Sequence, residues 1–151
     1  MDAIVEAVGE ALRGSGVSYA GMFDDLVILA SYEAGQDAAT NARVTAAAAI
    51  ALRDRLAGVT AGWGTGSEFR MALDIGPVMT SSGKTHDAGA SLWGGAVSVA
   101  KILAATGGRR TITVSEAAYR LLSPDFLFRQ RGTYFLPETG TMRTFVLVDA
   151  L

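Results

Sequence analysis

Hydrophobic and polar residues recur along this chain at two spacings, one typical of helices and the other typical of strands. Apolar residues at three- and four-residue spacing predict helices at 2–13, 35–56 and 92–103. Glycines follow all three segments, as they commonly do where helices end. The segment 35–56 is rich in alanine, the residue with the highest helix propensity, so we expect a long amphipathic helix there.

Runs of β-branched, aromatic and other apolar residues predict the strands of the fold. These runs lie at 17–22, 26–32, 69–75, 111–114, 126–131, 133–136 and 143–148. The first two are separated by Phe23-Asp24-Asp25, which predicts a hairpin with aspartate at its tip. Ser115 is expected to cap a short helix. Helices interspersed with hairpins predict one α+β domain over residues 1–151, with helices covering a mostly antiparallel sheet.

Composition narrows the class of protein. The chain has 151 residues, half of them hydrophobic, which is enough to bury a core without disulfides or metals. A formal net charge of −2 gives no electrostatic basis for binding nucleic acid or an anionic membrane. The absence of cysteine excludes disulfides, thiolate metal sites and cysteine nucleophiles. The first residues include Asp2 and Glu6 and form no long apolar run, so we expect a cytoplasmic protein without membrane insertion.

Two glycine-containing segments suggest nucleotide binding, but neither has the required spacing. The Gly-Lys-Thr at 83–85 would need a glycine where Val78 stands to form a phosphate-binding loop. The glycines in 62–66 alternate with other residues, which is not the spacing of a dinucleotide fingerprint, and no strand precedes them. Both segments are predicted to be surface loops.

One histidine and two aspartates are the remaining candidates for chemistry. His86, the single histidine, lies in a polar segment beside Asp87, and no positioned serine accompanies it, so we expect an exposed side chain without a catalytic role. Asp24 and Asp25 together could hold Mg²⁺, which takes a few carboxylate oxygens and keeps its waters. Aspartate is also favoured in tight turns for its backbone hydrogen bonds, and the residues alone favour the turn.

Four segments carry a resemblance to a known family. They are Trp-Gly-x-x-Val-x-x-Ala at 93–100, the strand Ile-Thr-Val-Ser with the helix after it at 112–119, Asp-Ile-Gly-Pro-Val at 74–78, and the final hairpin at 131–145. In this order and spacing they resemble the class III nucleotide cyclase homology domain of adenylate and guanylate cyclases. The resemblance implies an α+β fold and pairing of two such domains.

The resemblance also assigns catalytic positions. Cyclases of this class use two Mg²⁺ ions held by two aspartates, together with an asparagine and an arginine on the central helix. The second metal aspartate corresponds to Asp24, and the first belongs to an opening strand that precedes the first helix. This sequence starts at that helix, so we expect a domain truncated at its N-terminus relative to the family. The asparagine corresponds to Ser98 and the arginine to Ile102.

The residues that read the nucleotide base are replaced as well. The base-reading lysine corresponds to a position near Ala20, and the base-reading aspartate to Ser91. Lys101 is one residue from the arginine position, but one helical step rotates a side chain by about 100°, so we expect it to point away from Ser98. The resemblance therefore predicts a catalytically silent domain, with no cofactor and with Mg²⁺ or Mn²⁺ only if it is active.

Three functions remain open at this point. The first is a pseudoenzyme that acts as a dimerising or regulatory module, self-associating through the neighbourhood of the central helix and the Phe23 hairpin. The second is an adenylate or guanylate cyclase completed by a partner or by a missing segment. The third is a sensor that binds a small ligand in the former nucleotide cleft, which the apolar Ala20 and Ile102 would suit.

Overall fold

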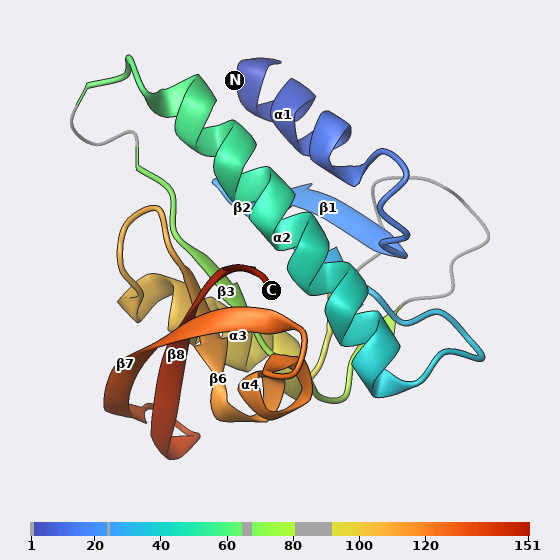
Figure 1. The fold of residues 1–151 in the computed structure, drawn as a ribbon, viewed down its shortest axis with the longest axis vertical. Coiled ribbons are helices and arrows are strands. Elements are labelled where there is room, and N and C mark those ends of the chain that lie inside the picture. Colours follow the sequence, from blue (N-terminus) through green and yellow to red (C-terminus); the bar gives the residue numbers. More distant parts are fainter. Residues whose placement is uncertain (1, 24, 65–67, 81–91) are drawn as a thin grey trace.

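The computed structural model describes residues 2–23, 25–64, 68–80 and 92–151 (Figure 1). In chain order the elements are α1 (Asp2–Leu12), β1 (Tyr19–Phe23), β2 (Leu26–Ala30), α2 (Ala38–Thr60), β3 (Met71–Leu73), β4 (Met79–Thr80), β5 (Leu92–Trp93), α3 (Gly95–Thr106), β6 (Ile112–Ser115), α4 (Glu116–Leu122), β7 (Phe126–Leu136) and β8 (Gly140–Ala150). None of the helices among these residues combines the length and apolarity that crossing a membrane requires.

The strands form one four-stranded sheet and two separate hairpin-like pairs. The larger sheet has the order β3-β6-β8-β7, in which β3 and β6 are parallel and the other neighbours antiparallel. β1 pairs with β2, and β4 pairs with β5, both antiparallel. The predicted α+β class with a mostly antiparallel sheet is confirmed.

Helices cover both faces of the larger sheet. On one face, small buried alanines of α2 (Ala42, Ala46 and Ala49) bring the helix close to Leu73 and Val114 of the sheet, and α4 packs into the same cluster. On the other face, α3 contacts β3 and β6 (Figure 1). Because β-strand side chains alternate between faces, the branched residues of β6 that face α2 alternate with polar ones that face away from it.

α2 begins and ends at residues that the sequence only partly predicted. Its start is fixed by Asp37, whose Oδ1 accepts a hydrogen bond from the Thr40 N–H at 2.7 Å. The expected end near Leu56 is wrong, because the helix continues through Gly58 to Thr60. The last turn is held by burial: Leu56 packs in a cluster with α1, and Thr60 is buried with its hydroxyl donating to the Leu56 carbonyl at 2.7 Å.

Glycines allow close approaches at both ends of α3. Gly94 has φ of +133°, and a Cβ there would lie 2.4 Å from the Pro77 carbonyl oxygen, so the turn into α3 requires glycine. At the other end, a Cβ on Gly107 would lie 2.4 Å from Oγ1 of Thr113. The two ends of α3 are therefore held close to the Pro77 backbone and to Thr113 of β6.

β7 was expected as two strands but is one. Its pairing with β8 continues across register shifts at Leu127/Phe128 and Gln130/Gly132, and Gly132 has φ of +136°. A bulge of this kind inserts an extra residue without ending the ladder, so the glycine that looked like a break bends the strand instead.

Candidate functional site

The described positions that the resemblance assigns on α3 lie one turn apart. Ser98 is exposed, Ile102 is half-buried, and Leu103 beside it is fully buried against the sheet. Residues four apart share a helix face, so Ser98 and Ile102 form the strip of α3 next to its packed side. The strip offers one hydroxyl and one aliphatic side chain.

Lys101 also belongs to this surface. It is exposed like Ser98, and residues three apart on a helix are neighbours on the same face. The expectation that Lys101 points away from Ser98 is therefore wrong. The rotation of about 100° separates Lys101 from Ile102, whereas Ser98 is three residues from Lys101 and lies on the same face.

The β1–β2 hairpin packs against α3 with one of its two faces. Tyr19 and Ile28 contact the cluster that contains Val97 of α3. Ala20 alternates with Tyr19 along β1, is exposed, and pairs across the hairpin with Leu29, which packs toward α1 and α2. The structure thus places Ala20 on the hairpin face that does not pack against α3. Asp24 and Ser91, the other two assigned positions, lie outside the described residues, as does His86.

The metal expectation can be examined only where the chain is described. Asp25 is exposed at the hairpin tip. Across residues 2–23, 25–64, 68–80 and 92–151, no three His, Cys, Asp or Glu side chains lie together as a metal site would need. Ser98 and Ile102 bring no carboxylate, so α3 adds no ligand of the kind that Mg²⁺ prefers. The expectation that Asp24 binds Mg²⁺ or Mn²⁺ only in an active domain, and otherwise serves the turn, stays a prediction.

Exposed apolar side chains surround the start of α3. Met79 of β4 and Trp93 of β5 are cross-strand partners, with exposed fractions of 53% and 44%. Trp93 immediately precedes the Gly94 that begins the helix. This short ribbon therefore presents a tryptophan and a methionine to solvent just before α3 begins.

A partly buried carboxylate follows the edge strand β3. Asp74 follows β3, and its Oδ1 accepts a hydrogen bond from Ser115 Oγ at 2.5 Å. Burial raises the pKa of Asp74, and the hydrogen bonds from Ser115 and from the Ile75 backbone oppose that rise. The sequence identified Ser115 as the cap of α4, which is confirmed by the Ala118 N–H donating to its Oγ at 3.2 Å, but did not show its bond to Asp74.

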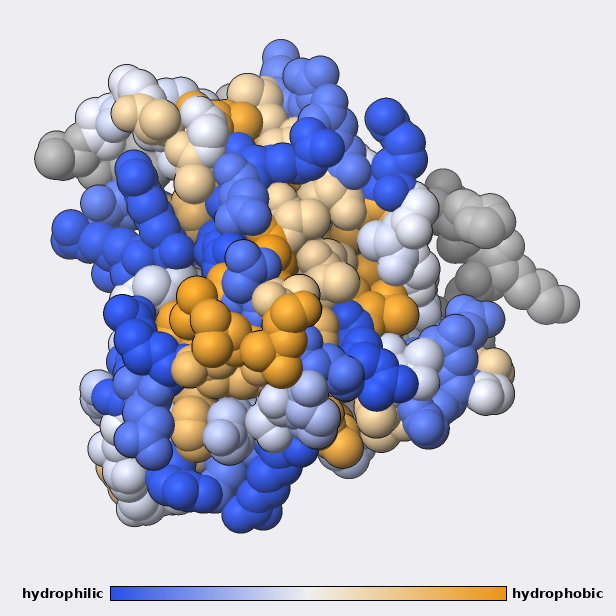
Figure 2. Space-filling view, viewed as in Figure 1, coloured by the Kyte–Doolittle hydropathy of each residue, from blue (hydrophilic) through white to orange (hydrophobic). Residues whose placement is uncertain are grey.

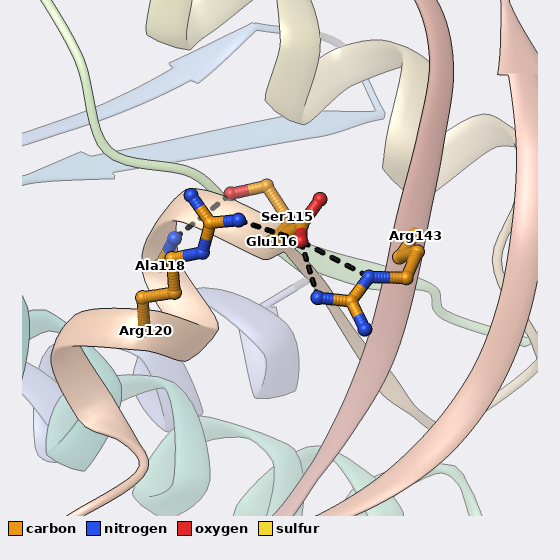
Figure 3. A network of polar contacts seen from close by, with 5 residues as sticks. All are labelled: Ser115, Glu116, Ala118, Arg120 and Arg143. Carbon is orange, nitrogen blue, oxygen red and sulfur yellow. Dashed lines mark hydrogen bonds and ion pairs between the residues drawn. The ribbon is translucent and has the colours of Figure 1, made fainter.

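A second polar cluster joins α4 to β8 (Figure 3). Glu116 Oε1 accepts hydrogen bonds from Arg143 Nε at 3.0 Å and from Arg120 Nη2 at 2.9 Å. The hydrogen bond and charge of Arg143 lower the pKa of Glu116, and Glu116 raises the pKa of Arg143 in return. Arg143 is thus engaged by a carboxylate. Of this cluster, only the Glu116–Arg120 spacing of four residues was visible in the sequence.

A family model described as the adenylate and guanylate cyclase catalytic domain matches residues 19–149. The chain belongs to this family. Adenylate cyclases of Mycobacterium tuberculosis and Mycobacterium bovis are each 32% identical to it over 80 residues. That match covers 53% of this chain but only 18% of those relatives, so the chain corresponds to a minor part of their length.

Solved cyclase domains share the fold. The adenylyl cyclase CyaB of P. aeruginosa has a TM-score of 0.78 at 17% identity, covering 99% of this chain and 82% of that one. The guanylate cyclase domain from Catenaria anguillulae in complex with GTP has a TM-score of 0.78 at 16% identity, covering 98% and 81%. A non-canonical dimeric guanylyl cyclase domain from Blastocladiella emersonii has a TM-score of 0.76 at 17% identity, covering 98% and 80%. Within the cyclase family, this domain has Ser98 and Ile102 on its central helix.

Proposed function

We propose that this cyclase-family domain forms no cyclic nucleotide and acts as an association module within a signalling protein. The observation that carries the proposal is the pair of exposed Ser98 and half-buried Ile102 on one strip of α3. Transfer of a phosphoryl group depends on donors and cations aimed at the charge that develops in the transition state. An aliphatic side chain at Ile102 provides neither.

The loss of transition-state stabilisation at Ile102 is larger than one neighbouring side chain can restore. Removing a single transition-state donor typically costs roughly 2.7–4 kcal/mol, a factor of about 10²–10³ in rate. Lys101 supplies one cation beside Ser98, but as a flexible point charge it lacks the planar, forked donor set of a guanidinium. Arg143 is held by Glu116, at 2.5 Å from its Nη2, and so is not free to serve instead.

Exposed apolar residues favour association as the remaining role. Trp93 and Met79 stand next to each other in solvent, and both residue types are enriched in the cores of protein interfaces. The Blastocladiella domain of the same fold has crystallised both as a non-canonical dimer and as a monomer, so this fold is compatible with pairing. We propose that two copies of this domain, or this domain and a related one, pair through the surface formed by Met79, Trp93 and the Ser98 strip.

A second exposed apolar surface provides the matched control for this proposal. Figure 2 shows hydrophobic side chains gathered where β7 begins and β8 ends. Leu127, Val148 and Leu151 are exposed in this part of the chain. Sedimentation equilibrium over a wide concentration range should show self-association of the parent. Trp93→Ser should weaken it at least tenfold, and Leu127→Ser should leave it unchanged. A parent that stays monomeric, or a Leu127→Ser effect as large as that of Trp93→Ser, would contradict the proposed surface.

The Ser98–Lys101 pair favours one second candidate, a nucleotide-binding sensor. A hydroxyl and an ammonium on neighbouring exposed positions could contact a phosphate without catalysing transfer. Titration calorimetry with ATP and GTP, each with Mg²⁺ and with Mn²⁺, separates the two functions. The association module predicts no heat of binding, whereas a sensor predicts saturable binding that Lys101→Ala weakens.

A further inference from the structure

Two arginines share one carboxylate where α4 meets β8. Glu116 Oε1 accepts hydrogen bonds from Arg120 Nη2 and from Nε and Nη2 of Arg143 (Figure 3). Among the described residues, no other carboxylate forms an ion pair with either arginine. Two positive charges and one negative charge leave a surplus of one positive charge, and the two arginine side chains are 71% and 55% exposed. The surplus charge therefore faces solvent.

Glu116 fixes Arg143 but occupies only one edge of its guanidinium group. Nε and Nη2 form the edge that faces Glu116, and Nη1 has no hydrogen-bond partner among the described residues. A guanidinium group has five N–H donors in a planar fork, so its second edge can receive another carboxylate. Glu116 thus positions a cation whose remaining donors are available to a ligand.

A hollow of about 90 Å³ lies beside Arg143 on the surface of the β7–β8 hairpin, and Gln130, Gly132, Thr133 and Phe145 also line it. The pairing of β7 with β8 shifts register between Gln130 and Gly132, and Gly132 has no side chain to fill the space. A water molecule takes about 30 Å³ in the liquid, so the hollow has room for roughly three waters or for a group as small as a carboxylate. Thr133, the cross-strand partner of Arg143, and Gln130 bring a hydroxyl and an amide donor to it.

An exposed aromatic ring lies next to this hollow. Phe135 is 76% exposed and follows Thr133 by two residues, so both side chains lie on the same face of β7. Thr133 pairs with Arg143 and Phe135 pairs with Thr141, which makes Phe135 a diagonal neighbour of Arg143. Such neighbours are about 7–8 Å apart. Alternate residues of an extended peptide are separated by about 7 Å, so two of them can reach the cation and the ring together.

We propose that the hollow beside Arg143 binds the side-chain carboxylate of an aspartate or glutamate in a partner polypeptide, whose next residue but one is apolar and packs on Phe135. The open edge of the Arg143 fork matches a planar carboxylate. One carboxylate neutralises the surplus charge, whereas a phosphate group of about −1.5 to −2 would leave a negative charge beside Glu116. The exposed ring favours a polypeptide over a free small carboxylate, because only the polypeptide covers both.

A second copy of this chain fits the site less well. Its exposed Asp149 and Leu151 are two residues apart, as the ligand requires. However, Asp149 Oδ1 accepts a hydrogen bond from the Ala150 N–H at 2.9 Å, and the Leu151 N–H donates to the Asp125 carbonyl at 3.1 Å. These bonds hold the segment beside the start of its own β7. A segment of a separate partner is not held in this way.

The probe is the peptide Gly-Ser-Glu-Thr-Leu-Ser-Gly, blocked at both ends so that glutamate is its only charge, titrated into isotope-labelled protein and followed by NMR. The proposal predicts saturable shifts of the Thr133, Phe135 and Arg143 amides. Glutamine in place of glutamate should weaken binding at least tenfold, and serine in place of leucine should weaken it as well. Phosphoserine in place of glutamate should bind no more tightly. Absence of saturable shifts at these amides, equal affinity of the glutamine peptide, or tighter binding of the phosphoserine peptide would overturn the proposal.

Variants in the hairpin test the site from the protein side. Arg143→Gln should weaken peptide binding at least tenfold, and Phe135→Ser should also weaken it. Arg129→Gln is the matched control and should bind like the parent, because Arg129 is an exposed arginine of the same hairpin that does not line the hollow. An equal loss in Arg129→Gln and Arg143→Gln would show unspecific attraction and overturn the site. Should Arg143→Gln not fold, Phe135→Ser decides, since it removes an exposed ring, and unchanged binding by that variant would contradict the proposal.

Self-association provides the last outcome. Arg143→Gln should leave the self-association of the parent unchanged, because the hollow is separate from Met79 and Trp93. A dimer that Arg143→Gln dissociates would mean that a second copy occupies the hollow, which would overturn the choice of a separate partner.

Discussion

Ser115 donates a hydrogen bond to Asp74 while capping α4, so a single hydroxyl joins the end of β3, the end of β6 and the start of a helix. The carboxylate that accepts this bond is partly buried, and burial raises its pKa. The two residues are 41 positions apart in the sequence. The pair therefore fixes how α4 sits on the sheet, at an electrostatic cost that depends on pH.

That cost predicts how Asp74→Asn changes stability with pH. The pKa of Asp74 is raised in the folded protein, so its contribution to stability is complete below its unfolded pKa, about 3.9, and is lost as the pH rises through the folded pKa. Asparagine keeps an oxygen for Ser115 and never ionises. Relative to the parent, Asp74→Asn should therefore gain stability from pH 3 to pH 7, as measured by urea unfolding at each pH. A loss of relative stability over that range would show that the ionised Asp74 is stabilising.

Alanine at Gly94 should destabilise the folded protein much more than alanine at the neighbouring Gly95. In Gly94→Ala, the new Cβ would meet the Pro77 carbonyl, and the positive φ is unfavourable for any L side chain, so we expect a loss of about 2–3 kcal/mol. Gly95→Ala is the control, since a Cβ there has no neighbour within 4 Å and lies in the first turn of α3. Alanine at Gly95 should be neutral or stabilising by up to about 1 kcal/mol. Equal losses in thermal unfolding would contradict the close contact with Pro77.

Removing the hydroxyl of Thr113 should stabilise the folded protein. The side chain is fully buried, and its Oγ1 has no hydrogen-bond partner among the described residues. Thr113→Val keeps the shape and removes the unpaired group, so we expect a gain of about 1 kcal/mol in the free energy of unfolding. Thr144→Val is the matched opposite case, because the equally buried Thr144 hydroxyl donates to the Gly132 carbonyl at 3.1 Å. Destabilisation by both variants would show that Thr113 has a partner in solution.

Local patterns predicted the elements of this fold better than their long-range arrangement. The periodicity identified α1 and α3, although the expected bounds 92–103 were wrong because Leu92 and Trp93 form β5 and α3 runs from Gly95 to Thr106. Ser115 was recognised as a helix cap because capping depends on residues within one turn. The parallel pairing of β3 with β6 joins segments about forty residues apart and leaves no local signal. The same reason hides the Asp74–Ser115 and Glu116–Arg143 contacts, whereas the Ser98 and Ile102 positions followed from the order of motifs that resemble the cyclase family.

The most direct measurement of the central claim, catalytic silence, is synthesis of cyclic nucleotide by the purified domain. ATP and GTP would each be supplied with Mg²⁺ and with Mn²⁺, with the P. aeruginosa adenylyl cyclase as positive control and Asp24→Ala as the matched variant. Ile102 offers no hydrogen-bond donor to the charge that develops in the transition state. We therefore predict no more cyclic AMP or cyclic GMP than in a protein-free blank. Metal-dependent product from the parent that disappears in Asp24→Ala would contradict it.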